Sequence, residues 1–199
     1  MPKRMGEIGL FFGSFNPVHT GHLIIANYMA DYTHLDEIWF VVSPQNPFKS
    51  KEELLPEAQR LALLELAIIG DDRFKTCNIE FNLPRPSYTA NTLEEISIKF
   101  PNHAFTLIIG GDNLQSFHQW KDYESILEKH AVFVYARTGI VEQQNIANHP
   151  SIKLFEVPLL NISSTYIRQT IQASKSIKYL VPELVRQEIV RLGLYKLLV

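Results

Sequence analysis

The segment from Gly13 to His22, GSFNPVHTGH, constrains the fold of this chain more than any other stretch. An apolar run, 8–12, precedes it, and apolar residues at helical spacing follow it over 23–29. The segment therefore marks a point where a buried strand is followed by a helix. Unbonded backbone N–H groups and the positive end of the helix dipole meet at such a point, which suits an anion such as a phosphate.

Short apolar runs and helical patterns alternate along the whole chain. The runs that predict buried strands are 8–12, 37–42, 74–79, 105–109, 131–135 and 152–157. The patterns that predict helices after the first are 57–69, 89–100, 123–129, 141–148, 163–173 and 182–192. This alternation predicts an α/β fold with a doubly wound, mostly parallel sheet, helices on both faces and right-handed crossovers.

Several polar segments follow the predicted strands directly. In a sheet of this kind, ligands bind beyond the carboxyl ends of the strands. The residues expected there are His19, His22, 46–49, 110–112 and Arg137. The fold would therefore bring together residues that are distant in the sequence.

Length, charge and cysteine content limit the class of protein. The 199 residues fit one domain, 1–199, or one domain with a small appendage. A net charge of −2 gives no general case for binding nucleic acid or a membrane, so phosphate binding must be local. The single cysteine, Cys77, excludes an intrachain disulfide and fits the cytoplasm. No apolar run approaches the roughly 18 residues of a membrane span, and we expect no signal peptide. The oligomeric state stays open, a homo-oligomer included.

The residue types of the opening segment suit a phosphate. Gly13 allows a close approach or a positive φ, Pro17 fixes the loop backbone, and Gly21 lets the helix start pack closely. His19 and His22 are three residues apart, so they can lie on one side of a helix start. Imidazole N–H groups can donate to phosphate oxygens, more strongly when they are protonated.

Other readings of the two histidines stay open at this point. Neither Gly-x4-Gly-Lys-Ser/Thr nor Gly-x-Gly-x-x-Gly occurs, so the common phosphate loops are absent. A zinc site is an alternative, although His19 and His22 do not have i, i+4 spacing and no third ligand is evident nearby. Surface or capping histidines are the other alternative.

A second segment, 161–168, has related chemistry. Ser163, Ser164 and Thr165 can cap the following helix and offer N–H and hydroxyl donors to an anion. Arg168 lies one turn further and adds a fixed cation. The alternative is a plain N-cap followed by a surface arginine.

Both segments resemble signatures of the nucleotidyltransferase superfamily. The residues 19–22, HTGH, match its His-x-Gly-His motif, which is also similar to the class I aminoacyl-tRNA synthetase site. The residues 161–168, NISSTYIR, resemble its second signature, Ile-Ser-Ser-Thr-x-Ile-Arg. The resemblance implies a Rossmann-like fold, with a small helical C-terminal part of about 160–199 that carries the second signature.

Four more blocks resemble bacterial nicotinate mononucleotide adenylyltransferases. The block 86–93, PSYTANTL, is similar to Gly-Pro-Ser-Tyr-Thr-x-Asp-Thr-Leu, with Arg85 and Asn91 as departures. The block 46–49 is similar to Asn-Pro-His-Lys, with Phe48 as a departure. The remaining similar blocks are 110–113 with Trp120, and 180–195, so the resemblance extends from about 8 to 195.

The resemblance implies a two-substrate site for ATP and nicotinate mononucleotide. The catalytic residues would be His19, His22, Lys49 and Arg168. The ATP-binding residues would be Gly13, Ser14, Phe15, His19, Gly21, His22, Gly110, Asp112, Ser163, Ser164, Thr165 and Arg168. The acceptor would be bound by Asn16, Lys49, Ser87, Tyr88, Thr89 and Trp120. Mg²⁺ would be bound to the phosphates, with few or no direct protein ligands.

The implied reaction is adenylyl transfer, with pyrophosphate as the leaving group. The nucleophile is a phosphate oxygen that is already anionic, so no general base is required. The alternatives are preference for nicotinamide mononucleotide, a phosphopantetheine adenylyltransferase, and a nucleotide-binding module without catalysis.

Several of these residues could also have a purely structural role. Tyr88 and Trp120 could be core packing, Asp112 a helix N-cap, and Lys49 part of a solvated loop. Ser87 or Thr89 could cap the helix 89–100. Arg60 is expected to be a surface salt-bridge partner.

Overall fold

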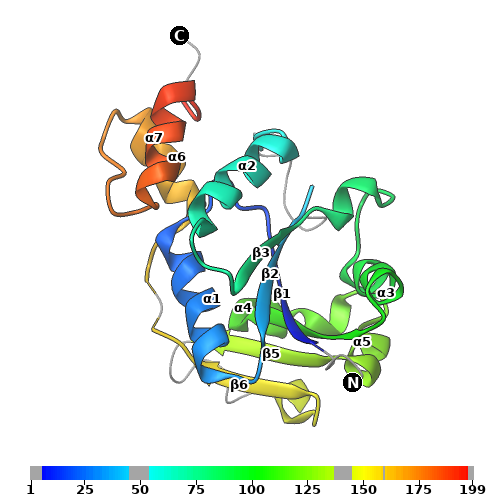
Figure 1. Cartoon of the computed structure of the whole chain (residues 1–199). Helices are drawn as coiled ribbons and strands as arrows, with labels where there is room; N and C mark the ends of the chain where they lie inside the picture. The colour runs from blue at the N-terminus through cyan, green and yellow to red at the C-terminus, as the bar shows by residue number, and fades with distance from the viewer. Residues whose placement is uncertain (1–5, 45–53, 137–144, 159, 197–199) are drawn as a thin grey trace.

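The computed structural model describes residues 6–44, 54–136, 145–158 and 160–196. In this part of the chain, six parallel strands form one sheet in the order β3-β2-β1-β4-β5-β6 (Figure 1). The strands are β1 Gly6–Gly13, β2 Glu37–Val42, β3 Phe74–Cys77, β4 His103–Gly110, β5 Ala131–Ala136 and β6 Ile152–Glu156. The predicted Rossmann-like α/β fold is therefore confirmed.

Helices connect the strands. The α-helices are α1 Thr20–Tyr32, α2 Glu57–Ile68, α3 Thr89–Lys99, α4 Gly111–Gln115, α5 Tyr123–Lys129, α6 Ser164–Gln172 and α7 Glu183–Leu192. The short 3₁₀ turns are η1 Ile79–Asn82, η2 Phe117–Gln119 and η3 Asn145–Asn148. The helix predicted over 141–148 is wrong for 145–148, which form η3, and 141–144 lie outside the described residues. No described helix has the length and apolar character needed to cross a membrane.

Alternate residues of the central strands pack into two separate cores. Leu10 and Leu107 face one core, which α3, α4 and α5 cover. Their neighbours Phe11 and Ile108 face the other, which α1, α2, α6 and α7 cover. Buried on both faces, the strands read as continuous apolar runs. Figure 1 shows α1 and α2 on one side of the sheet and α3 and α5 on the other.

The strand order places a topological switch between β1 and β4. From β1 the chain passes to β2 and β3 on one side, then crosses to β4 on the other. The connections leaving β1 and β4 therefore diverge at the carboxyl edge, where α/β sheets of this type bind their ligands. The segment after Gly13 and the segment after Gly110 flank this point.

Candidate active site

The β1–α1 loop is shaped by a phenylalanine. The ring of Phe15 is so close to Gly13 that a Cβ there would lie 2.8 Å from it. Phe15 is buried, and its φ of 45° lies in the left-handed region. The close approach expected at Gly13 is confirmed, whereas the positive φ belongs to Phe15. The Phe15 ring then packs edge-on against His22, with centroids 5.1 Å apart.

His19 and His22 lie together at the start of α1. His19 is the N-cap residue, and its backbone N–H donates to Nδ1 of His22 at 3.2 Å. The two imidazole rings are stacked, with centroids 3.7 Å apart. A Cβ on Gly21 would lie 3.1 Å from the His19 ring, which shows how closely the helix start packs on it. The expectation that both histidines lie on one side of the helix start is confirmed.

Burial controls the charge of His19. Its side chain is 6% exposed, and burial lowers its pKa to about 4. Among the described residues, its Nδ1 has no hydrogen-bond partner. His19 is therefore neutral near pH 7 in the free protein, and the protonated donor considered from the sequence does not apply to it.

The second signature contacts the β1–α1 loop from the far end of the chain. The Ser164 hydroxyl donates to the Pro17 carbonyl at 2.8 Å. The Arg168 guanidinium donates to the Asn16 carbonyl at 3.0 Å and to the Thr165 hydroxyl at 3.4 Å. The bonds to Pro17 and Asn16 join residues that are about 150 positions apart in the sequence.

Ser163 caps α6. Its side chain accepts a hydrogen bond from the Tyr166 N–H at 3.1 Å, as expected for an N-cap serine. The bond from Ser164 to the Pro17 carbonyl places the positive end of α6 next to the start of α1. The Thr20 N–H of α1 donates to the Leu180 carbonyl, in the segment after α6, at 3.0 Å. Two helix N-termini meet at this edge, so the site favours a negatively charged group.

Arg60 is not a surface residue, so the expectation from the sequence is wrong. It is 1% exposed and donates only to backbone carbonyls in the described structure. Those carbonyls belong to Ser14, Ser43, Pro44 and Leu55. Burial lowers the pKa of Arg60, but a guanidinium stays charged at neutral pH. This side chain therefore links the β1–α1 loop to the segment that follows β2.

The segment before α3 is fixed differently from the expectation. Tyr88 is the N-cap residue of α3 and makes no side-chain cap, so neither Ser87 nor Thr89 caps this helix. The Ser87 hydroxyl instead donates to the buried carboxyl of Glu80 at 3.1 Å. The Lys121 ammonium lies 5.1 Å from the Tyr88 ring centroid.

The α4–η2 region carries Gly110, Asp112 and Trp120. Gly110 is the N-cap residue of α4, so Asp112 is not the cap but an exposed residue of the first turn. Trp120 is half-buried and packs on Phe117, with ring centroids 5.1 Å apart. The expected roles of Asp112 and Trp120 rest on their place at the carboxyl edge.

Some of the residues predicted to lie at the site are not in the described part of the chain. Lys49, the rest of the 46–49 block, and Arg137 lie outside the described residues.

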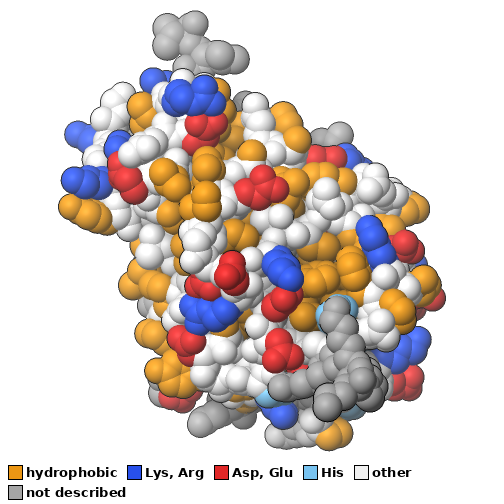
Figure 2. Space-filling view, viewed as in Figure 1, with side chains coloured by type: hydrophobic (Ala, Val, Ile, Leu, Met, Phe, Trp, Pro, Cys, Tyr) orange, Lys and Arg blue, Asp and Glu red, His pale blue; other side chains and the backbone are white. Residues whose placement is uncertain are grey.

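Within residues 6–44, 54–136, 145–158 and 160–196, no three His, Cys, Asp or Glu side chains form a group that could hold a metal ion. Acidic and basic side chains are interspersed over the face shown in Figure 2.

Sequence reasoning missed the buried positions of Arg60 and Glu80. Arg60 has a usable signal, because it lies three and four residues before the buried Leu63 and Leu64, on the apolar face of α2. Glu80 follows the buried Ile79, and nothing local identifies its hydroxyl partners.

The strand order and the two signatures define the class of nucleotidyltransferases with a Rossmann-like sheet, and the comparisons agree. The sequence model of the family described as "Cytidylyltransferase-like" matches residues 10–170. A solved structure of Plasmodium falciparum nicotinic acid mononucleotide adenylyltransferase complexed with NaAD has the same fold. Its TM-score is 0.79 at 20% identity, over 96% of this chain and 97% of that one.

Relatives of higher identity define the family. A protein named "Probable nicotinate-nucleotide adenylyltransferase" from Cytophaga hutchinsonii is 50% identical over 181 residues, which cover 91% of this chain and 94% of that protein. The protein of the same name from Flavobacterium johnsoniae is 47% identical, over 96% of this chain and 99% of its own length. The chain belongs to the nicotinate-nucleotide adenylyltransferase family.

Proposed function

We propose that this chain transfers the adenylyl group of ATP to nicotinate mononucleotide, giving nicotinate adenine dinucleotide and pyrophosphate. The observation that carries the proposal is the contact between the two signatures. Ser164 and Arg168 bond to the carbonyls of Pro17 and Asn16 beside the histidine pair. A site built in this way presents N–H groups, hydroxyls and a guanidinium to a polyphosphate. The names of the relatives support this choice of substrates.

The reaction needs positioning and charge stabilisation more than proton transfer. The acceptor phosphate is anionic at neutral pH, so it can attack the α-phosphate without a general base. Nδ1 of His22 accepts the N–H of His19, so the neutral ring carries its proton on Nε2. That N–H would donate to an α-phosphate oxygen, where charge develops in the transition state. The N-terminus of α1, with His19, would bind the adjacent phosphate oxygens.

The leaving pyrophosphate would be held by the second signature. The backbone N–H groups at the start of α6, that of Ser164 included, are donors, and Arg168 supplies a permanent cation on the same helix. Lys49, outside the described residues, would assist from its loop. The four residues assigned to catalysis, His19, His22, Lys49 and Arg168, thus act as donors and none as a nucleophile.

The donor set fits Mg²⁺ that is bound to the substrate phosphates. The groups around the β1–α1 loop are hydrogen-bond donors, which bind phosphate oxygens. The acidic residue expected at the same edge of the sheet is the exposed Asp112, in the first turn of α4. Mg²⁺ commonly keeps several waters and takes one or two carboxylates in addition to phosphates. When bound, the ion would neutralise part of the triphosphate charge. Asp112 would meet it directly or through a water.

The acceptor half would be formed by Asn16, Ser87, Tyr88, Thr89 and Trp120. A flat anionic pyridine needs an aromatic face and a few donors. Trp120 would stack on the ring, and backbone N–H groups near Tyr88 and Thr89 would bind its carboxylate. We place the reaction in the cytoplasm, which the free buried thiol of Cys77 fits.

A pyrophosphate-release assay with ATP and Mg²⁺ tests the proposal. Nicotinate mononucleotide, nicotinamide mononucleotide and phosphopantetheine are compared as acceptors, and the product is identified by mass. We expect the highest kcat/KM with nicotinate mononucleotide. A higher value with either other acceptor would overturn the substrate assignment. Measurable ATP binding with no release for any acceptor would instead favour a non-catalytic module.

A further inference from the structure

We propose that Glu80 is a positioning residue for the acceptor mononucleotide. It fixes the segment 87–89, which we assign to the acceptor, to the end of β2. This inference rests on the proposed function, and it concerns a buried carboxylate that the reaction itself does not use. Glu80 belongs to η1, directly after β3, and is 2% exposed.

Three hydroxyl groups converge on the Glu80 carboxyl from separate parts of the chain. The Thr92 hydroxyl donates to Oε1 at 2.7 Å, and the Ser87 hydroxyl donates to Oε2 at 3.1 Å. The Ser43 hydroxyl, just after β2, hydrogen-bonds to the same carboxyl. A carboxylate only accepts hydrogen bonds, so its requirement matches three hydroxyl donors. Burial raises the pKa of Glu80, while these three bonds oppose that rise.

The geometry of this cluster fixes the backbone between its members. Ser87 and Thr92 lie on either side of Tyr88 and Thr89. The Thr92 N–H also donates to the Tyr88 carbonyl at 3.1 Å. The backbone N–H groups near Tyr88 are therefore held from both sides. A buried polar group is costly when it loses its partners, so the cluster resists rearrangement.

The cluster is also connected to the ATP half of the site. Arg60 donates to the Ser43 carbonyl at 2.8 Å and to the Ser14 carbonyl in the β1–α1 loop. A chain of hydrogen bonds thus runs from Ser14 through Arg60, Ser43 and Glu80 to Ser87. Loss of the Glu80 carboxylate would break the bond to Ser87, at the acceptor end of this series of hydrogen bonds. The bonds from Arg60 to the Ser43 and Ser14 carbonyls would remain.

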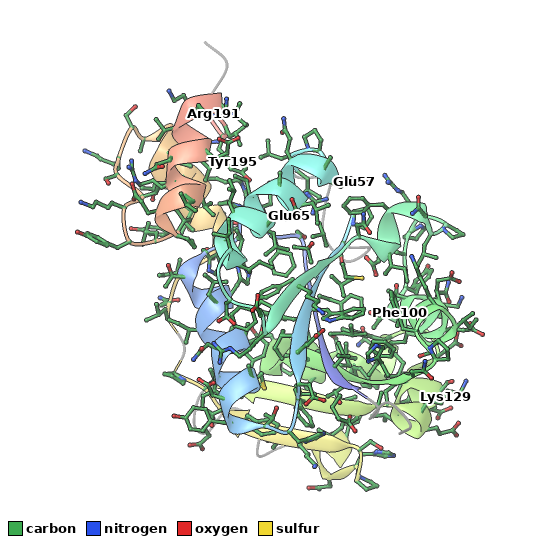
Figure 3. The ribbon with its side chains drawn as sticks, in the orientation of Figure 1. Glu57, Glu65, Phe100, Lys129, Arg191 and Tyr195 are labelled. Atoms are coloured by element: carbon green, nitrogen blue, oxygen red, sulfur yellow. The ribbon has the colours of Figure 1, made fainter. Side chains whose placement is uncertain are left out.

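A second, exposed brace reaches the same segment from α2. The Arg85 guanidinium donates to both carboxylate oxygens of Glu57, at 2.8 and 2.9 Å. Figure 3 shows Glu57 at one end of α2. Arg85 is exposed, and surface ion pairs contribute little, so this brace cannot replace the buried one.

Steady-state kinetics of Glu80→Gln and Thr92→Val test the inference, because Thr92 donates to Glu80 and is not assigned to the acceptor site. Each change removes one acceptor or donor of the cluster at nearly constant volume. We expect the KM for nicotinate mononucleotide to rise about tenfold, as for the loss of one hydrogen bond to a charged group, and the KM for ATP to change less than about twofold. The double variant should resemble Glu80→Gln alone, because both changes break the same link.

The control is Ser97→Ala, which removes another hydroxyl of α3. The Ser97 hydroxyl donates to the Leu93 carbonyl at 2.7 Å and has no contact with Glu80 among the described residues. This variant should leave both KM values unchanged. Thermal unfolding of all variants then separates a loss of stability from a change in acceptor binding.

The outcomes separate this inference from the proposed function. A wild-type chain that makes no dinucleotide overturns the proposed function and this inference with it. An active wild type with unchanged acceptor KM in Glu80→Gln and Thr92→Val overturns only the role of Glu80. Equal rises in both KM values, or a lower kcat alone, also overturn it, because a merely structural role predicts that result. If Glu80→Gln does not fold, the KM split in Thr92→Val decides.

Discussion

The imidazole rings of His19 and His22 are stacked at 3.7 Å, and the His19 N–H donates to Nδ1 of His22. This bond fixes which nitrogen of His22 carries the proton, so Nε2 of the neutral ring is the donor. His19 is instead buried, with a pKa lowered to about 4. The two histidines of one motif are therefore not equivalent. His22 is arranged to donate, and burial keeps His19 neutral at the N-terminus of α1.

The burial of His19 predicts a specific dependence of stability on pH. Its pKa falls from 6.5 to about 4 on folding, so between these values the unfolded chain binds more protons. Stability should therefore fall as the pH falls from 6.5 to 4, by roughly 3 kcal/mol through this group. Urea unfolding across this range should show a shallower decrease for His19→Asn.

The exposed His118 supplies the control for that experiment. His118→Asn makes the same substitution at an exposed ring and controls for the exchange of histidine for asparagine itself. The same slope in His19→Asn and wild type would contradict the assigned burial of His19.

His22→Ala should lower kcat on the order of 10²-fold or more, as for the loss of one oxyanion donor. The fold should survive, because the ring is only half-buried and lies at the start of α1. Pyrophosphate release measures the rate, and circular dichroism checks the fold. Turnover near that of the wild type, in a folded variant, would remove His22 from the mechanism.

The sequence predicted the secondary structure well where local patterns decide it. The strand 37–42 and the helix 123–129 have the predicted bounds, because apolar runs and polar boundaries mark their ends. The strand predicted over 74–79 ends at Cys77. There the chain turns into η1, and Glu80 meets hydroxyls from remote segments. No pattern within 74–79 contains that information.

The sequence predicted the motifs of the site but not the hydrogen bonds that connect its buried residues. The His-x-Gly-His segment and Arg168 were expected in one site, and the structure places Arg168 on the Asn16 carbonyl. Arg60 was expected at the surface, because an arginine in a helix usually is. Its burial depends on carbonyls from two loops that are brought together by the sheet. Such partners can be identified only once the topology is known.

Arg60→Leu should destabilise the chain by about 3–5 kcal/mol, because it leaves several buried carbonyls without donors. Arg60→Lys should recover only part of this loss, since an ammonium cannot reproduce the fork of the guanidinium. Denaturant unfolding measures both changes. Arg191→Leu is the control, because Arg191 lies on α7 (Figure 3) and pairs only with Glu188 in the described structure. A loss for Arg60→Leu no larger than for Arg191→Leu would contradict the structural role of Arg60.

Arg168→Gln should affect ATP rather than the acceptor. The guanidinium of Arg168, on α6, donates to the Asn16 carbonyl of the β1–α1 loop. A glutamine at this position loses the permanent charge that would face the β- and γ-phosphates. We expect the KM for ATP to rise about tenfold or more, because a charged contact contributes at least about 1.5 kcal/mol, while the KM for nicotinate mononucleotide stays within about twofold. Arg191→Gln, a charge loss on the neighbouring helix α7, should change neither value. A rise in the acceptor KM alone would move Arg168 to the other half of the site.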